Sequence, residues 1–276
     1  MRNQKILVLF LVSALFAVLL NGNLKEKAKL GRLNQDTVTS NEFRIHDFTE
    51  EAADELRNFE SKNRGIIAGL YLLQRGEVED EKAFFREENL RMQKKIWEKR
   101  PAWKEYAGFC EAVWNDVTYF PVPVSSRNKK YQVSYVDSWM SERTFGGKRG
   151  HEGCDIMASE DKPGLYPVIS MTDGVVENMG WLEKGGYRIG IRAPLGGYFY
   201  YAHLDCYADL KEKAEVKAGD VLGFMGNSGY GPEGTKGMFA THLHLGIYIY
   251  PDGKEVSINP YWILRTIEEK KLSCSF

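Results

Sequence analysis

Histidine and aspartate side chains in the C-terminal half of the chain have the types and spacing of a metal site. Four of the five histidines lie there, and Asp155 stands four residues after the first of them. A catalytic zinc ion needs three such nitrogen or carboxylate ligands and one coordination position open to water. The sequence therefore predicts a metal-dependent hydrolase built from His151, Asp155, His203, His242 and His244.

The pair His242 and His244 lies in a strongly β-forming run, residues 242–250. Side chains two apart on a strand point to the same face, about 7 Å apart along the backbone, so both imidazoles can reach one site. The spacing leaves two interpretations open: both histidines ligate the metal, or one ligates it and the other assists catalysis.

The segment around His151 is rich in glycine, which argues against a helix. In an extended chain His151 and Asp155 share a face, and Glu152 and Cys154 point the other way. This alternation selects His151 and Asp155 as ligands and disfavours Glu152 as a general base. The competing interpretation is that these histidines are structural side chains with satisfied hydrogen bonds. It would have to hold for four histidines at once, so the metal site is favoured. For the isolated His46 the structural interpretation is sufficient.

The rest of the chain divides into a helical part and a β part. Helical spacing predicts helices from about 47 to 57, from 66 to 73, from 80 to 100 and from 103 to 113, with Asp47 and Glu50 resembling a capping box. A proline-containing stretch, residues 121–124, ends this region. Short β-branched runs separated by glycine turns follow it and predict antiparallel strands at 166–170, 174–177, 187–192, 198–203, 221–225 and 242–250.

The N-terminus carries basic residues and an apolar run over residues 6–20, which predicts a secretory signal or a short membrane anchor. A net charge of −1 gives no field that would gather nucleic acid, so no nucleic-acid partner is expected. Four cysteines allow three full pairings; Cys154 and Cys206 are the expected pair if one forms, and the alternative is reduced, buried thiols.

These signals predict an α+β protein, with an N-terminal helical region followed by a mostly antiparallel β catalytic domain. The expected division is a signal or anchor at 1–22, a polar linker at 23–46, a helical region at 47–120, a linker at 121–130, a β domain with the metal site at 131–265 and a tail at 266–276. The helical region could be a spacer, a surface for a protein partner or an inhibitory cover over the site.

Several motifs together resemble the lysostaphin-type zinc endopeptidases of peptidase family M23, which cut peptidoglycan peptides. The resemblance covers residues 149–260 and includes His151-Glu152-Gly153-Cys154-Asp155, Tyr201-Ala202-His203-Leu204, Gly226-Asn227-Ser228-Gly229 and His242-Leu243-His244. It implies one zinc ion per chain held by His151, Asp155 and His244, with His203 and His242 as unliganded catalytic histidines. It also implies a groove on the sheet as the site.

One departure from the family pattern is an insertion, residues 231–240, before His242. This loop is expected to form a wall of the groove and to affect substrate preference. The expected function is hydrolysis of peptidoglycan stem peptides or cross-bridges, outside the cytoplasm of a bacterium, by a secreted or membrane-anchored enzyme. The alternatives are a non-catalytic wall-binding or assembly module on the same fold, and zinc-dependent hydrolysis of another peptide.

Overall fold

The computed structural model describes residues 11, 13, 15–18, 20–22, 27–74 and 76–276. The predicted signal or anchor, residues 1–22, therefore lies largely outside the described residues. Among the residues that are described, none of the helices combines the length and the apolar character needed to cross a bilayer.

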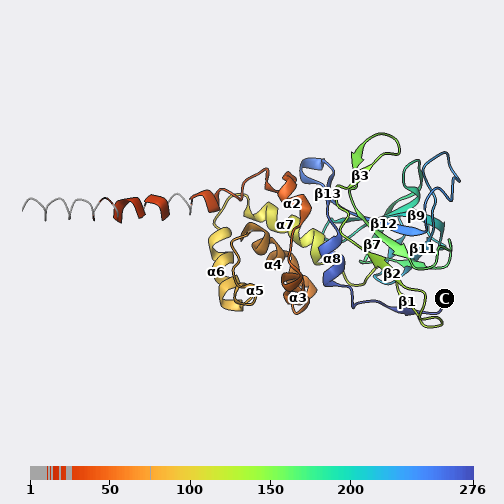
Figure 1. The fold of residues 1–276 in the computed structure, drawn as a ribbon, viewed down its shortest axis with the longest axis horizontal. Coiled ribbons are helices and arrows are strands. Elements are labelled where there is room, and N and C mark those ends of the chain that lie inside the picture. The colour runs from red at the N-terminus through yellow and green to blue at the C-terminus, as the bar shows by residue number, and fades with distance from the viewer. Residues whose placement is uncertain (1–10, 12, 14, 19, 23–26, 75) are drawn as a thin grey trace, which may run out of the picture.

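Helices occupy one end of the molecule and strands the other (Figure 1). The predicted helical region is confirmed, although the predicted helix over 80–100 is two helices because Phe84 and Phe85 both turn into the core. The cap of the helix after residue 49 is Thr49, whose hydroxyl accepts from Ala52 N at 3.0 Å, so the predicted cap at Asp47 was wrong. The helical elements are η1 (Thr37–Thr39), α2 (Asn41–Ile45), α3 (Glu50–Arg57), α4 (Ser61–Gln74), α5 (Glu81–Phe84), α6 (Glu87–Trp97) and α7 (Trp103–Trp114).

The prediction of a polar linker at residues 23–46 was wrong, because this range contains η1 and α2. Leu33, Val38 and Phe43 of this segment are buried in the core of the helical region. Few of its residues are apolar, which is why its composition resembled a linker.

The strands form one large sheet in the order β10-β7-β8-β9-β12-β5-β2, in which every described pair is antiparallel. β11 pairs with β6 and β9, and β13 pairs with β12. The six predicted strands are confirmed. Those of this sheet are β2 (Val133–Tyr135), β5 (Cys154–Ala158), β6 (Pro167–Ile169), β7 (Gly174–Leu182), β8 (Gly186–Arg192), β9 (Tyr198–Tyr207), β10 (Glu215–Val216), β11 (Val221–Met225), β12 (His242–Ile249) and β13 (Val256–Ile258).

The smaller elements correct two further predictions. β1 (Val124–Ser125), in the predicted linker 121–130, pairs in parallel with β14 (Ser273–Cys274), in the predicted tail. The chain end is thus fastened to the start of the β region. β3 (Glu142–Arg143) and β4 (Arg149–Gly150) form a separate hairpin, η2 (Pro251–Gly253) follows β12, and α8 (Tyr261–Thr266) lies between the helices and the sheet.

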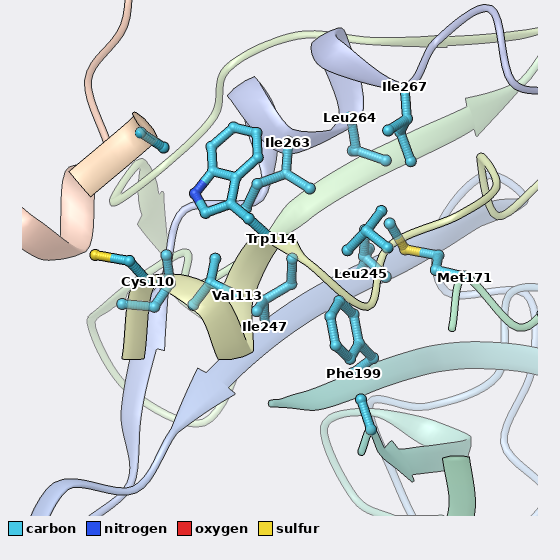
Figure 2. Close-up of a cluster of buried hydrophobic side chains, with 14 of the residues drawn as sticks. Cys110, Val113, Trp114, Met171, Phe199, Leu245, Ile247, Ile263, Leu264 and Ile267 are labelled. Carbon is cyan, nitrogen blue, oxygen red and sulfur yellow. The ribbon is translucent and has the colours of Figure 1, made fainter. Parts of the chain in front are cut away.

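The helical region packs against the face of β12 that is opposite to the histidines. Figure 2 shows Val113 and Trp114 of α7 beside Ile247 of β12, with Ile263 of α8 completing the contact. These side chains belong to one continuous buried cluster. The helical region is therefore part of the support of the sheet, and it does not cover the face that carries His242 and His244.

All four cysteines are free thiols, so of the two alternatives the reduced state holds; Cys154 is buried as expected, but Cys206 is exposed. β5 and β9 lie on opposite sides of β12, about 10 Å apart. This separation exceeds the Cα distance that a disulfide can bridge, which is at most about 7 Å.

The contact between α4 and α7 gives a prediction for Gly65. A Cβ at this position would lie 2.6 Å from Glu111 Cα, whereas a Cβ at Gly108 of α7 would meet nothing within 4 Å. We expect Gly65→Ala to lower the free energy of unfolding by about 2 kcal/mol or more through overpacking. Gly108→Ala should raise it by about 0.5–1 kcal/mol because alanine favours the helix. Urea unfolding of both variants checks this, and equal effects would contradict the close backbone approach.

His46 gives a second prediction, on pH. It is fully buried beside Phe43 and Trp114, and its Nε2 has no hydrogen-bond partner. Burial lowers the pKa of His46 to about 4 from 6.5, against the hydrogen bond to Phe43 O. As the pH falls, His46 is protonated in the unfolded state before it is protonated in the folded state. The free energy of unfolding therefore decreases between pH 6.5 and pH 4, by up to about 3 kcal/mol.

The control variant is His46→Asn, because asparagine tolerates the left-handed backbone of this residue, φ 48°. Urea unfolding between pH 7 and pH 4.5 should show a weaker pH dependence in this variant than in the wild type. Identical pH dependence in the two proteins would refute the role of His46.

Candidate metal centre and catalytic groove

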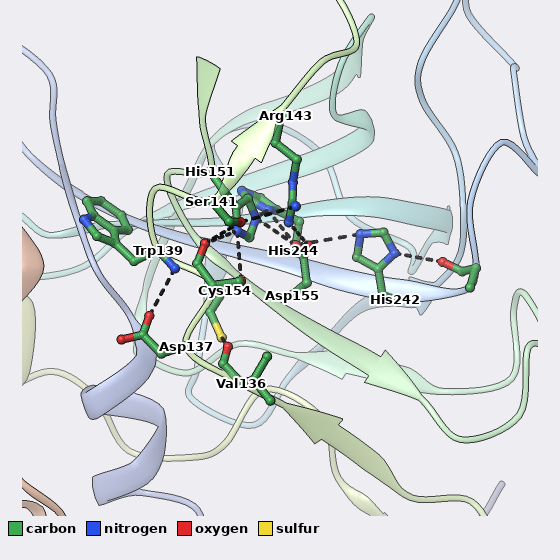
Figure 3. Close-up of polar contacts among 12 residues, drawn as sticks. Val136, Asp137, Trp139, Ser141, Arg143, His151, Cys154, Asp155, His242 and His244 are labelled. Atoms are coloured by element: carbon green, nitrogen blue, oxygen red, sulfur yellow. Dashed lines mark hydrogen bonds and ion pairs between the residues drawn. The ribbon is translucent and has the colours of Figure 1, made fainter. Parts of the chain in front are cut away.

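Three predicted ligands meet at one point on the sheet (Figure 3). His151 Nε2, Asp155 Oδ1 and His244 Nδ1 are separated by 2.9–3.0 Å from one another. β12 provides His244, which lies directly opposite Asp155 of β5. His151 stands between β4 and β5, so the antiparallel register brings the two distant motifs together.

The donor atoms fit a zinc ion. Ligands at about 2.0–2.2 Å in a tetrahedron are about 3.3 Å apart, close to the observed separations. His151 Nδ1 lies 3.0 Å from Ser138 Oγ and 3.2 Å from Ser138 O; the carbonyl can only accept, so it favours the tautomer in which Nδ1 carries the proton and Nε2 presents a lone pair. A lone pair facing a carboxylate oxygen is repulsive unless a cation lies between them. The donor set thus favours a cation at this point.

Asp155 is held as an anion. Burial alone would raise its pKa, but the close polar contacts of its carboxylate with the His151 and His244 rings and the nearby charge of His244 and His242 outweigh this and lower the pKa well below its usual range. Arg143 of β3 adds an ion pair, with a guanidinium nitrogen 2.7 Å from Asp155 Oδ2. One oxygen is thus left for a metal and the other is neutralised by the hairpin.

His242 and His203 lie beside this cluster. His242 Nε2 is 3.8 Å from Asp155 Oδ1, and the rings of His203 and His242 are 4.8 Å apart. His242 Nδ1 donates to Ala240 O at 2.8 Å, and His203 Nδ1 donates to Ser228 O at 2.8 Å. Both rings therefore keep Nε2 as the free nitrogen, as a general base requires.

The backbone conformation of His203 and two neighbouring glycines hold the rings of His203 and His244 in place. His203 adopts φ 62°, a left-handed conformation that is uncommon for a non-glycine residue, at a register shift of β9. A Cβ at Gly186 would collide with Ser228 O at 2.2 Å, and one at Gly153 would lie 2.4 Å from His244 Cε1. A side chain at Gly186 would displace the Ser228 carbonyl that holds His203, and a side chain at Gly153 would displace the His244 ring. Burial lowers the pKa of His203 to about 3, so the ring is neutral near pH 7.

Glu152 and Cys154 point away from the cluster, as the extended conformation predicts. Glu152 forms an ion pair with Arg44 of α2, and the Cys154 thiol faces Val136 O at 3.6 Å. Sequence reasoning did not identify Arg143, Ser138 or Ser228 as site residues. Ser228 could have been found, because it lies in the quoted Gly226–Gly229 motif; Arg143 has no motif and its place depends on the hairpin.

A cavity of about 670 Å³ extends from the cluster along the sheet. The inserted loop forms one wall, as expected, since Phe239 and Ala240 line the cavity and the centroids of the Phe239 and His203 rings are 4.6 Å apart. Tyr230, directly before this loop, also lines the cavity. Tyr230 stacks on Phe145 of the β3–β4 hairpin at 4.3 Å, so the loop and the hairpin meet beside the site.

Comparisons with known proteins agree with this architecture. Residues 149–260 match the model of peptidase family M23, and residues 28–116 match that of the LytM N-terminal domain. The L-Ala–D-Glu endopeptidase of Bacillus subtilis (strain 168) is 45% identical over 150 residues, which are 54% of this chain and 43% of that protein. The chain therefore spans less than half the length of this relative.

A solved structure matches nearly the whole chain. The crystal structure of a protein from Ruminococcus gnavus ATCC 29149, assigned as a glycyl-glycine endopeptidase LytM, is 47% identical. The match covers 90% of this chain and 98% of that chain, with a TM-score of 0.83. With this similarity and the two domain matches, the chain belongs to peptidase family M23 and carries a LytM-type N-terminal domain.

Proposed function

We propose that this protein is a zinc-dependent endopeptidase that hydrolyses peptide bonds of peptidoglycan. Family membership supports peptidase activity. The observation that carries the zinc proposal is the convergence of His151 Nε2, Asp155 Oδ1 and His244 Nδ1 within a groove. One zinc ion held by these atoms would leave a coordination position facing the groove.

When bound, zinc lowers the pKa of its water to about 7 and polarises the scissile carbonyl. The chain's own residues do the rest. His242 Nε2 lies beside Asp155, whose charge stabilises the imidazolium formed when His242 takes the proton of the attacking water. Ala240 O holds the other nitrogen, so His242 keeps its orientation during transfer.

His203 is the second catalytic histidine in this proposal. Because its Nδ1 proton donates to Ser228 O, its Nε2 faces the groove as an acceptor. The developing negative charge of the tetrahedral oxygen favours protonation there, so His203 can then donate to the oxyanion or to the leaving amine. Its burial excludes water that would otherwise compete for the ring.

The substrate proposal is a peptidoglycan stem peptide or cross-bridge. The two relatives carry the names of different bonds, L-Ala–D-Glu in one and glycyl-glycine in the other. Both names describe peptide bonds, which agrees with an open groove beside the metal centre. We place the enzyme outside the cytoplasm, secreted or anchored through residues 1–22.

A non-catalytic wall-binding module on the same fold is the alternative from another class. Such a module would need a groove but no aligned histidines. Here His203 and His242 both present a free Nε2 beside a complete ligand set, which is an arrangement that binding alone does not require. This feature favours the enzyme.

Two variants separate metal binding from catalysis. The wild type should contain about one zinc ion per chain by elemental analysis and clear a peptidoglycan gel. His244→Ala should lose both the zinc and the clearing because one of three ligands is gone. His242→Ala should keep the zinc and lose at least about 100-fold in rate, because the base is removed and the ligands remain.

Removing the metal with a chelator should abolish clearing, and added zinc should restore it. Stoichiometric zinc without hydrolysis of any wall preparation would instead support the binding module. Loss of zinc in His242→Ala would contradict the assignment of ligand and base.

A further inference from the structure

The groove carries more positive than negative side chains. Its lining contains Arg143, Arg149, Lys184 and Arg188 against three carboxylates, Glu152, Asp155 and Glu255. Each carboxylate already has a partner: Arg44 binds Glu152, Arg143 binds Asp155, and Tyr250 donates its hydroxyl hydrogen to Glu255 at 2.9 Å. The excess positive charge is therefore available to a ligand, and it favours an anionic one.

Arg188 of β8 lines the groove and lies on the same sheet as the cluster. Ile189 pairs with Tyr201 and Tyr187 with Leu204, so the register shift leaves Arg188 opposite the Ala202–His203 step of β9. Ala202 in turn pairs with His244 of β12. Arg188 and His244 are thus two strand spacings apart, about 10 Å between their backbones. An arginine side chain can span part of this distance, so its guanidinium can reach a peptide that lies in the groove beside the cluster.

The guanidinium of Arg188 lacks an acceptor. Its Nη1 is buried without a hydrogen-bond partner, and no carboxylate of the described residues forms an ion pair with it. Its charge is close to Tyr200, which also lines the groove: burial raises the pKa of Tyr200, and the positive charge of Arg188 opposes this rise. A buried guanidinium nitrogen without an acceptor costs free energy that a bound carboxylate would recover.

Arg192 provides a comparison on the same face of the same strand. Its guanidinium forms two hydrogen bonds with Glu177, at 2.6 and 2.7 Å, and it is absent from the lining of the groove. β8 therefore carries one arginine whose charge is satisfied inside the protein and one whose charge is left for a ligand.

We propose that Arg188 binds the free carboxylate of a glutamate-type residue next to the scissile bond, so that the substrate class is an acidic stem peptide. This inference rests on the proposed peptidase function. A glutamate in a peptide keeps one free carboxylate whichever of its carboxyl groups joins the chain, whereas a glycine bridge offers none. Arg188 is therefore a specificity-determining residue, and a planar guanidinium suits bidentate binding of a carboxylate.

The test compares two peptides with the zinc-loaded, full-length protein. One is N-acetyl-L-alanyl-γ-D-glutamyl-L-lysine, and the other has the free α-carboxylate of its glutamyl residue converted to a carboxamide. The wild type should cleave the carboxylate peptide with at least about a 10-fold higher kcat/KM, because the neutral peptide leaves Arg188 unpaired. Arg188→Gln should lower kcat/KM only for the carboxylate peptide and bring the ratio close to one. Arg188→Lys should keep part of the preference.

Arg192→Gln is the matched control, and its ratio should equal that of the wild type. An unchanged ratio in Arg188→Gln, or no preference in the wild type, would overturn the proposal. Binding of non-cleavable forms of both peptides, with a reduced scissile bond, is measured by calorimetry in parallel. If neither peptide is cleaved but the wild type binds the carboxylate form at least about 10-fold more tightly than Arg188→Gln does, the peptidase proposal fails and the Arg188 site stands.

Discussion

The two-residue alternation of β12 is the constraint on which the rest of the structure depends. Leu243, Leu245 and Ile247 face the core that the sheet shares with α7 and α8, and His242 and His244 face the groove. Because the side-chain period of a strand is two, a shift of one residue would bury both histidines and expose the leucines. The apolar contact with the helical region therefore fixes the orientation of the catalytic face.

The position of β12 within the sheet has a second consequence. Its neighbours are β5, which carries Asp155, and β9, which carries His203. The three adjacent strands therefore bring Asp155, His203, His242 and His244 to one face of the sheet. Backbone carbonyls of Ser138, Ser228 and Ala240 then orient the rings. Such outer contacts fix the tautomers and leave the correct nitrogen free. Asp155 and His244 of the candidate metal site lie on strands, and His151 lies in the short connection between β4 and β5, while the hairpin and the inserted loop enclose the site.

Much of this arrangement can be predicted from the sequence, because it depends on local periodicity. Alternation placed His151 with Asp155 and His242 with His244, and the structure brings all four together. Helical spacing likewise predicted α3, α4 and α7. The failures concern features set by tertiary contacts. The segment with Val38 and Phe43 buries few apolar side chains and so resembles a linker. The state of Cys154 and Cys206 stayed open at the sequence level because the distance between them depends on strand order. The ion pair of Arg143 with Asp155 has no sequence signal, because a hairpin outside the main sheet supplies the arginine.

The central claim is that His151, Asp155 and His244 share one zinc ion. Anomalous X-ray diffraction from crystals of the zinc-loaded protein, recorded on both sides of the zinc absorption edge, tests this directly. A single strong peak about 2.0–2.2 Å from His151 Nε2, Asp155 Oδ1 and His244 Nδ1 is expected, with His203 and His242 outside the coordination sphere. A peak bound through His242 or Cys154, or no ordered zinc within reach of Asp155, would contradict the account.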